Sequence, residues 1–159
     1  MQDKELFRFL DMSVMTLEEY SELFHWIIRC YSVSPDRDFK YSFNVCLKET
    51  GKTIGWIGIG GVEYNHSVKE IYWLIGREFQ NKGYASEAAA ALLEYGFTVM
   101  GLDEITAVCK PENIASEKVM KKIGLKYQGF VAGLPEQYAF YNGELKYALS
   151  KQEFERAGM

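Results

Sequence analysis

The sequence predicts a mixed α/β fold that forms a single domain over residues 1–159. Stretches with helical periodicity and stretches of alternating apolar residues follow each other in the order helix, three strands, helix, strand, helix, and two or three strands. Hydrophobic residues make up 48% of the chain, which is enough for a packed core, and a formal charge of −4 is too small for a disordered polyelectrolyte. No internal repeat or linker divides the chain.

The first helix and the first two strands are predicted from local signals. Thr16 and Glu19 have the spacing of a capping box, and apolar residues at helical spacing extend the expected helix to about Cys30. Two alternating stretches, residues 41–47 and 54–59, flank a short turn that contains glycine. We expect these two stretches to form a hairpin.

The middle of the chain is expected to place a buried strand before a long helix. A polar loop over residues 63–69 leads into a strand over residues 71–75, which is apolar on both faces and therefore belongs in the centre of a sheet. An alanine-rich stretch from Tyr84 to Met100 then predicts a helix that ends at Gly101.

The last third of the chain is expected to alternate between strands and one helix. The predicted elements are a strand over residues 105–109, a helix over 113–123, and strands over 125–131, 138–141 and 145–149. Asn142-Gly143, between the last two strands, is the strongest short hairpin signal in the sequence.

Charge and cysteine content exclude several classes of protein. The 22 acidic residues outnumber the 18 basic ones without a basic cluster, which argues against a dedicated nucleic-acid binder and requires any anion site to be local. No stretch has the roughly 20 apolar residues of a membrane span, and the first residues do not resemble a signal peptide. The three cysteines are far apart and without a nearby histidine, so neither disulfides nor a metal site is expected, and we predict a cytoplasmic protein.

The segment between the central strand and the long helix carries the clearest chemical signal. The first N–H groups of a helix have no partner within the helix and favour an anion. In Gln80-Asn81-Lys82-Gly83-Tyr84-Ala85, Gly83 leaves the backbone accessible and Lys82 adds a positive charge. These residues predict a pyrophosphate site, and an ordinary strand-to-helix turn is the alternative. Residues 58–61 make a poor dinucleotide fingerprint because no helix follows them.

Two motifs resemble the GNAT acetyltransferase superfamily. The first is the segment 80–85 followed by Glu87-Ala88, and the second is Asn113-x-x-Ser116 followed by residues 119–125. Within this superfamily the sequence is most similar to the branch of the ribosomal-protein N-terminal acetyltransferases RimJ and RimL. The likeness covers roughly residues 43–149.

The resemblance implies the GNAT acyl-CoA N-acyltransferase fold, a mixed, mostly antiparallel sheet that is splayed at its centre and flanked by helices. Acetyl-CoA is expected in the gap between the strand over 71–75 and the strand over 105–109. In such a fold the pantetheine arm pairs with the strand backbone and the pyrophosphate binds the loop. The implied cofactor contacts are Leu74, Ile75, Gly76, Gln80, Asn81, Lys82, Gly83, Tyr84, Ala85, Asn113 and Ser116.

Acetyl transfer from a thioester to an amine needs a base for the ammonium proton, donors for the oxyanion and a proton for the thiolate. Glu70, at the start of the central strand, has the position of the family's proposed base, and a solvated carboxylate at the strand end is the alternative. Other candidate bases are Glu63, His66 and Glu136.

The proton donor for the thiolate is expected at the second motif. Many members of the family carry a tyrosine seven residues after the motif asparagine, where this sequence has Met120. The RimL-like pattern places Ser116 near the sulfur instead, and helix capping is the alternative role for this serine. The resemblance places the oxyanion near a backbone N–H of Leu74 or Ile75, with Tyr127 as a further donor.

The sequence shows no counterpart of the usual first strand of the family before Thr16. The domain is therefore expected to be short at its N-terminus. Either the gene model is shortened there, or the protein lacks this strand, which would leave residues 41–47 as a sheet edge that a homodimer would cover. The predicted activity is transfer of the acetyl group of acetyl-CoA to a primary amine, either a protein N-terminus or a small molecule, without a metal, nucleic acid or membrane. The alternative is a catalytically degenerate domain that binds acyl-CoA as a sensor or assembly module.

Overall fold

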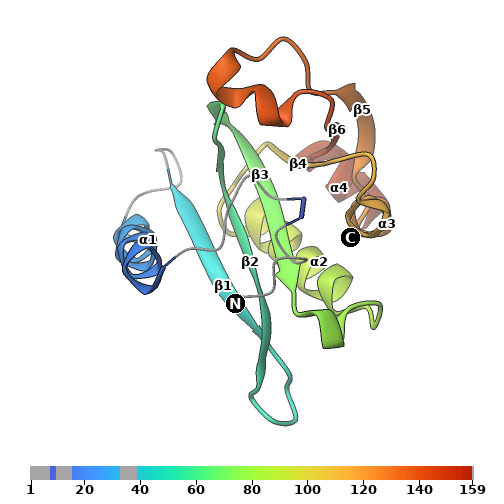
Figure 1. The fold of residues 1–159 in the computed structure, drawn as a ribbon. Helices are drawn as coiled ribbons and strands as arrows, with labels where there is room; N and C mark the ends of the chain where they lie inside the picture. The colour runs from blue at the N-terminus through green and yellow to red at the C-terminus, as the bar shows by residue number, and fades with distance from the viewer. Residues whose placement is uncertain (1–7, 10–15, 33–38, 159) are drawn as a thin grey trace.

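The structure, a computed structural model, describes residues 8–9, 16–32 and 39–158. These residues contain a six-stranded sheet with the strand order β1-β2-β3-β4-β6-β5 (Figure 1). The strands are β1 (Lys40–Cys46), β2 (Thr53–Val62), β3 (Asn65–Ile75), β4 (Glu104–Cys109), β5 (Lys126–Phe130) and β6 (Leu145–Ser150). The helices are α1 (Leu17–Cys30), α2 (Tyr84–Thr98), α3 (Ile114–Lys122) and α4 (Lys151–Ala157), with 3₁₀ helices η2 (Arg77–Phe79) and η3 (Glu136–Tyr141).

The sheet opens between β3 and β4, the one parallel pair among its five strand pairs. Within the described residues these two strands share a single register pair, Glu70 with Thr106. On its other side β3 stays paired with β2 as far as Ile75. The backbone of β3 beyond Glu70 therefore has a strand partner on one side only, which confirms the predicted splayed sheet.

Helix α2 packs against β2, β3 and β4, and so covers the opening from one face of the sheet (Figure 1). Leu93 and Phe97 of this helix share a buried cluster with strand residues from both sides of the opening, including Ile59, Ile71 and Ile105. Burial of apolar surface is the main favourable term in folding. The core beneath the opening therefore holds the two parts of the sheet together where strand pairing does not.

Local capping signals placed two helix starts correctly. The Thr16 hydroxyl accepts from the Glu19 N–H (3.2 Å) and the Glu19 carboxylate accepts from the Thr16 N–H (2.7 Å), which confirms the capping box of α1. The Asn113 side chain accepts from the Ser116 N–H (3.2 Å) and caps α3. The helix predicted from Tyr84 to Met100 ends two residues earlier, at Thr98.

The polar loop predicted over residues 63–69 is wrong. Glu63 and Tyr64 alone form a tight turn, and β3 begins at Asn65. Val62 pairs with Asn65, and a bulge next to Gly61 brings Lys69 into the ladder. The first three residues of β3 are exposed, so their polar side chains are compatible with a strand.

The strand predicted over residues 138–141 and the hairpin at Asn142-Gly143 are also wrong. Residues 136–141 form η3. Asn142 bonds across a wider loop, because its side chain accepts from the Leu134 N–H (3.1 Å) and donates to the Leu134 carbonyl (3.3 Å). The Gly143 N–H donates to the Val131 carbonyl (2.8 Å), so these two residues close a long connection rather than a tight turn.

Helix α4 was not predicted, although the sequence carries its signal. Ser150 and Glu153 form a second capping box with the same spacing as that of α1. The expectation that the first strand of the family is missing concerns residues before Thr16, and residues 1–7 and 10–15 lie outside the described residues.

Candidate active site

The segment 80–85 turns the chain from η2 into α2 through two residues with left-handed backbone. Asn81 has φ 60° and Gly83 has φ 88°. Gly83 is the N-cap of α2, and the first backbone hydrogen bond of the helix runs from the Glu87 N–H to the Gly83 carbonyl (3.0 Å). The three N–H groups between these residues therefore lie at the open helix start, where an anion is favoured. A Cβ atom on Gly83 would meet nothing within 4 Å, so a ligand can approach this backbone.

The side of β3 that faces the opening is identified by hydrogen bonds at its end. The Gly76 N–H donates to the Ile54 carbonyl on the β2 side (2.8 Å). Because backbone groups alternate along a strand, the N–H groups of Trp73 and Ile75 point toward β4 instead. Gln80 donates from Nε2 to the Ile75 carbonyl (2.9 Å) and ties the loop to this strand end. Of the predicted backbone contacts, Ile75 faces the opening, whereas the N–H groups of Leu74 and Gly76 face β2.

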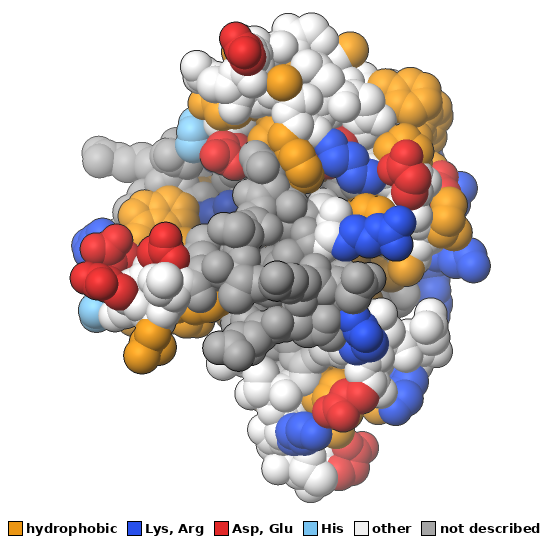
Figure 2. All heavy atoms as spheres, in the orientation of Figure 1, with side chains coloured by type: hydrophobic (Ala, Val, Ile, Leu, Met, Phe, Trp, Pro, Cys, Tyr) orange, Lys and Arg blue, Asp and Glu red, His pale blue; other side chains and the backbone are white. Residues whose placement is uncertain are grey.

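A cavity of 390 Å³ lies between the start of α2 and the end of α3. It is lined by Lys82, Gly83, Ser86, Glu87, Ala90, Lys122 and Ile123. Figure 2 shows blue Lys and Arg side chains over α3 and near the loop before α2. The positive charge at this end of a chain with formal charge −4 is therefore local, as the sequence predicts for an anion site.

Of the seven lining residues, Lys82 and Gly83 are predicted contacts, and the other five include two groups able to bind an anion, Ser86 and Lys122. Ser86 lies in the first turn of α2 and Lys122 in the last turn of α3. Serine in a first helical turn and lysine in a last turn are common on their own, so the sequence offers no specific signal for either. Only the packing of α2 beside α3 brings Lys122 near Lys82.

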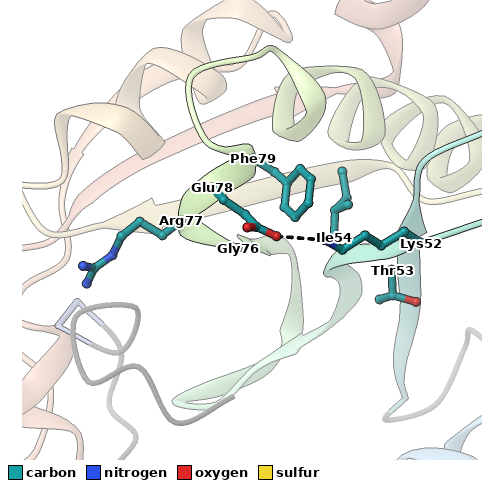
Figure 3. Close-up of a pocket in the computed structure, with 7 residues that line it drawn as sticks. All are labelled: Lys52, Thr53, Ile54, Gly76, Arg77, Glu78 and Phe79. Atoms are coloured by element: carbon teal, nitrogen blue, oxygen red, sulfur yellow. Dashed lines mark hydrogen bonds and ion pairs between the residues drawn. The ribbon is translucent and has the colours of Figure 1, made fainter. Parts of the chain in front are cut away.

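A larger cavity of 540 Å³ lies beside the end of β3 (Figure 3). Lys52 bonds Glu78 at its rim (3.0 Å) and lies 4.8 Å from the centre of the Phe79 ring, whereas Arg77 points away from them (Figure 3). Gly76 is the one predicted contact that lines this cavity. The other lining residues include Thr53 and Ile54 of β2, so the cavity lies on the side of β3 away from the opening.

Glu70, the predicted base, lies in β3 where β3 and β4 part. Burial raises the pKa of its carboxyl to about 7, Lys40 acts in the opposite direction, and the carboxylates of Glu144 and Glu63 raise the pKa further. A base with a pKa near neutrality is half ionised where acetyl transfer would operate, which suits proton transfer. The solvated-carboxylate alternative does not fit this half-buried side chain.

The Glu144 carboxylate lies on the other side of the opening and raises the pKa of Glu70 through its charge. It is buried and pairs with Lys110, which follows β4 (3.4 Å between Nζ and Oε1). Lys110 also donates to the Phe140 carbonyl and lies 3.8 Å from the centre of the Phe140 ring. This buried ion pair, which the sequence analysis missed, fastens η3 to the end of β4. Its members are 34 residues apart in the sequence, so no local pattern marks it.

The second motif begins α3 directly after β4. Asn113 uses its side-chain oxygen to cap the helix, so capping is the role of Asn113 rather than of Ser116. Met120, at the position of the family's tyrosine, is 1% exposed and packs in the core. Glu70 lies on β3, one of the two diverging strands, and Ser116 lies on α3, the helix that follows the other strand, β4.

The other candidate groups are less well placed for this site. Glu63 accepts a hydrogen bond from the Tyr141 hydroxyl (2.6 Å) in the turn before β3, and His66 is an exposed residue of β3 rather than a loop residue. Glu136 is exposed in η3. Tyr127 lies on β5, separated from β3 by β4 and β6, so the structure does not bring it to the opening.

The described residues contain no group of three or more potential metal ligands among His, Cys, Asp and Glu. No helix in this part of the chain is both long and apolar enough to cross a membrane.

The sequence profile of the Acetyltransferase (GNAT) domain matches residues 1–126. The chain is 43% identical over 113 residues to the uncharacterized N-acetyltransferase YnaD of Bacillus subtilis, an alignment that covers 70% of this chain and 65% of the relative. The chain therefore spans less than two thirds of the length of that curated relative.

Solved structures share the fold. A GNAT-family acetyltransferase from Bacillus anthracis has a TM-score of 0.75 and 29% identity, with 96% of this chain and 85% of that chain covered. A spermidine N-acetyltransferase from Vibrio cholerae, solved with CoA and spermine, has a TM-score of 0.74 over 97% of this chain and 87% of that chain, and its 19% identity shows the fold alone. The matched profile, the relatives and the splayed sheet agree: the chain belongs to the GNAT acetyltransferase family.

Proposed function

We propose that the protein is an acetyl-CoA-dependent N-acetyltransferase that transfers the acetyl group to a primary amine by direct attack on the thioester. One observation carries the proposal: β3 and β4 part directly after Glu70. A carboxyl with a pKa of about 7 thus lies at the apex of an open pair of strands. A thioester arm that enters between the strands would bring its carbonyl group close to this carboxylate.

Residues around the opening fit the parts of acetyl-CoA. The N–H groups of Trp73 and Ile75 face the opening and would pair with the amides of the pantetheine arm or with the oxyanion. The open start of α2 and Lys82 would hold the pyrophosphate. Lys122, across the cavity from Lys82, adds a cation for the remaining phosphate of CoA.

The reaction needs no covalent enzyme intermediate. Glu70 accepts a proton from the ammonium group, and the neutral nitrogen attacks the carbonyl carbon. The carbon–sulfur bond breaks as the tetrahedral intermediate collapses, and the nitrogen releases its second proton to solvent. The thiolate takes a proton from water or from the Ser116 hydroxyl. Met120 cannot supply this proton, because its side chain has none to donate.

The acceptor is a cationic primary amine. Glu63 and Glu70 supply negative charge on the acceptor side, and the rings of Tyr64 and Tyr141, tilted against each other with centroids 5.2 Å apart, supply aromatic faces that attract ammonium groups. Both a polyamine and a peptide N-terminus have this chemistry. The second motif favours the RimJ/RimL-like branch and hence a peptide N-terminus. We also propose that residues 1–159 act as one domain and that β1, the edge of the described sheet, is the homodimer contact.

A degenerate acyl-CoA-binding domain is the second candidate. The observation that favours it is the burial of Met120 in the core, because this position cannot donate a proton to sulfur. Such a domain would keep the loop at residues 80–85 and bind acetyl-CoA without turnover.

Calorimetric titration with acetyl-CoA, followed by an assay of CoA release, tests the proposal. We expect micromolar binding, and CoA release when spermine or a peptide with a free N-terminus is added. Glu70→Gln should keep the affinity for acetyl-CoA and lower turnover by about 10²-fold or more above pH 7, where the wild-type carboxylate is ionised, and by less at low pH, where it is protonated. Glu94→Gln, on the exposed side of α2, is the matched control. Binding without CoA release would favour the degenerate domain, and unchanged turnover in Glu70→Gln would exclude this residue as the base.

A further inference from the structure

A row of residues crosses three strands beside the proposed base. Lys40 of β1 pairs with Gly60 of β2, and Gly60 pairs with Glu70 of β3. Directly opposed residues in neighbouring strands project from the same face of a sheet. Lys40 and Glu70 therefore flank Gly60 on one face, with no side chain between them.

The chain requires glycine at the centre of this row. A Cβ atom on Gly60 would lie 2.6 Å from the Phe39 carbonyl oxygen and 2.9 Å from the Lys40 Cα, both of which belong to the backbone. Backbone atoms cannot move aside as the end of a flexible side chain can. The clear path between Lys40 and Glu70 is therefore a property of the backbone packing of β1 on β2.

The neighbouring row holds the lysine side chain. Tyr72 lies across Gly58, where a Cβ atom would come within 2.2 Å of the ring, and its hydroxyl lies 3.0 Å from the Ser42 hydroxyl. The Lys40 Nζ lies 5.0 Å from the centre of the Tyr72 ring, within the range of a cation–π contact. The ring thus holds the ammonium group on the face that carries Glu70.

We propose that Lys40 is a positioning residue for the acetyltransferase site: held over the Tyr72 ring and facing Glu70 across Gly60, its ammonium keeps the Glu70 carboxylate ionised and able to accept a proton. This inference rests on the proposed function, in which Glu70 is the base.

The other charged groups that face Glu70 raise the pKa of its carboxyl, whereas Lys40 lowers it. Glu63 in the turn before β3 and Glu144 before β6 bring negative charge toward it, and burial also disfavours its ionised form. Thr106, opposite Glu70 on β4, carries no charge and donates its hydroxyl to the Lys69 carbonyl (3.0 Å). Lys40 is therefore the cation that offsets burial and two carboxylates. Without it, the pKa of Glu70 would rise further and the carboxyl would be protonated near neutral pH.

Carbon-13 NMR of the glutamate side-chain carboxyls tests the inference without an acceptor. The Glu70 signal is assigned by its loss in Glu70→Gln and followed against pH in the wild type, Lys40→Met and Lys40→Arg. We expect Lys40→Met to raise the titration midpoint by about half a pH unit to one unit, and Lys40→Arg to stay near the wild type because it keeps the charge. Lys40→Gln, which should raise the midpoint in the same way, supplies a second test should Lys40→Met fail to fold.

Lys69→Met is the matched control, since it removes the same charge from the residue next to Glu70. The Lys69 ammonium donates to the His66 carbonyl (2.8 Å) and lies 4.9 Å from the centre of the Phe39 ring, on the other face of the strand from Glu70. We expect it to leave the Glu70 midpoint unchanged. An unchanged midpoint in folded Lys40→Met, or in Lys40→Gln where Lys40→Met does not fold, would overturn the inference whether or not the protein turns over.

The rate of spermine or peptide acetylation against pH supplies the kinetic readout. In Lys40→Met the acidic limb of kcat should move to higher pH by the shift that NMR measures, and Lys40→Arg should restore it. A shifted NMR midpoint with full turnover in Glu70→Gln would instead show that Glu70 is not the base. That result would overturn the proposed mechanism, and with it the role of Lys40, while leaving the charge coupling itself measured.

Discussion

The burial that suits Glu70 to act as a base near neutral pH also destabilises the folded protein. An ionised carboxylate in a half-buried site lacks part of its hydration, and two further carboxylates repel it. Only Lys40 opposes these effects among the groups that shift the pKa of Glu70. A residue that weakens the fold and yet lies at the opening of the sheet fits a functional role better than a structural one.

This conflict predicts how stability depends on pH. The pKa of Glu70 is about 7 in the folded chain against 4.5 for an ordinary glutamate, so the folded state binds the proton more tightly than the unfolded state. The stabilisation of the folded state by the proton on Glu70 is therefore fully present below pH 4.5. It is lost as the pH rises toward 7, and the loss is on the order of 3 kcal/mol. Glu70→Gln has no carboxyl group that titrates. We therefore expect the free energy of unfolding of this variant, relative to that of the wild type, to increase from pH 5 to pH 8. Urea denaturation at the two pH values measures the gain.

Glu94→Gln, an exposed substitution on α2, corrects this measurement for changes elsewhere in the chain. A difference between Glu70→Gln and the wild type that is the same at pH 5 and pH 8 would show that the folded pKa of Glu70 is not raised.

At the scale of elements, the loop at residues 80–85 was located by the sequence and its accessible backbone is visible in the structure. Gly83 adopts φ 88°, and the space above its Cα is open. A side chain there would not collide with the protein. Any effect of substitution on a ligand must come from the strained backbone and from the blocked approach.

Gly83→Val is therefore expected to weaken acetyl-CoA binding by more than tenfold, or above about 1.4 kcal/mol. Calorimetric titration measures the affinity. Gly133→Val is the matched control, because Gly133 also has a positive φ (74°) and open space around a Cβ atom. Gly133→Val should lower stability to a similar extent and leave the affinity unchanged. Equal affinity in the wild type and Gly83→Val would remove this loop from the cofactor site.

Elements whose cause is local could be predicted from the sequence. The capping box of α1 and the cap of α3 each join residues three positions apart, so the printed sequence contains the whole interaction. The capping box of α4 is equally local, because Ser150 and Glu153 are three positions apart, so this helix was predictable as well. The hairpin failed because Asn142 bonds Leu134, eight residues away, which turn propensities do not describe.

The features of the candidate site also fall into those set by the local sequence and those set by the pairing of distant strands. Glu70 and the loop at residues 80–85 follow from order along the chain, whereas the contacts of Lys40 and Tyr72 depend on the register of three strands. Gly58 and Gly60 were considered only as part of a poor dinucleotide fingerprint. In the structure they make room for the Tyr72 ring and for the close approach of β1. Their spacing of two, which places both on one face of a strand, was the available signal.

At the scale of the whole molecule, the sheet consists of two parts that meet at one parallel register pair within the described residues. One part contains β1 to β3, and the other contains β4 to β6 with α3 and α4. Helix α2 and the core beneath it join the parts on one face. Acetyl-CoA bound between β3 and β4 would contact both parts and so replace the strand pairing that the opening lacks.

Ligand binding should therefore raise the stability of the chain as a single unit. We expect one cooperative unfolding transition, whose midpoint rises with acetyl-CoA concentration because the ligand binds the folded state alone. At a free concentration 100 times Kd the added stability is about 2.7 kcal/mol. Differential scanning calorimetry with and without acetyl-CoA measures this shift, and the shift should be smaller in Gly83→Val and kept in Glu70→Gln. Two separate transitions, of which only one responds to the ligand, would show that acetyl-CoA binds one part of the sheet and does not bridge the opening.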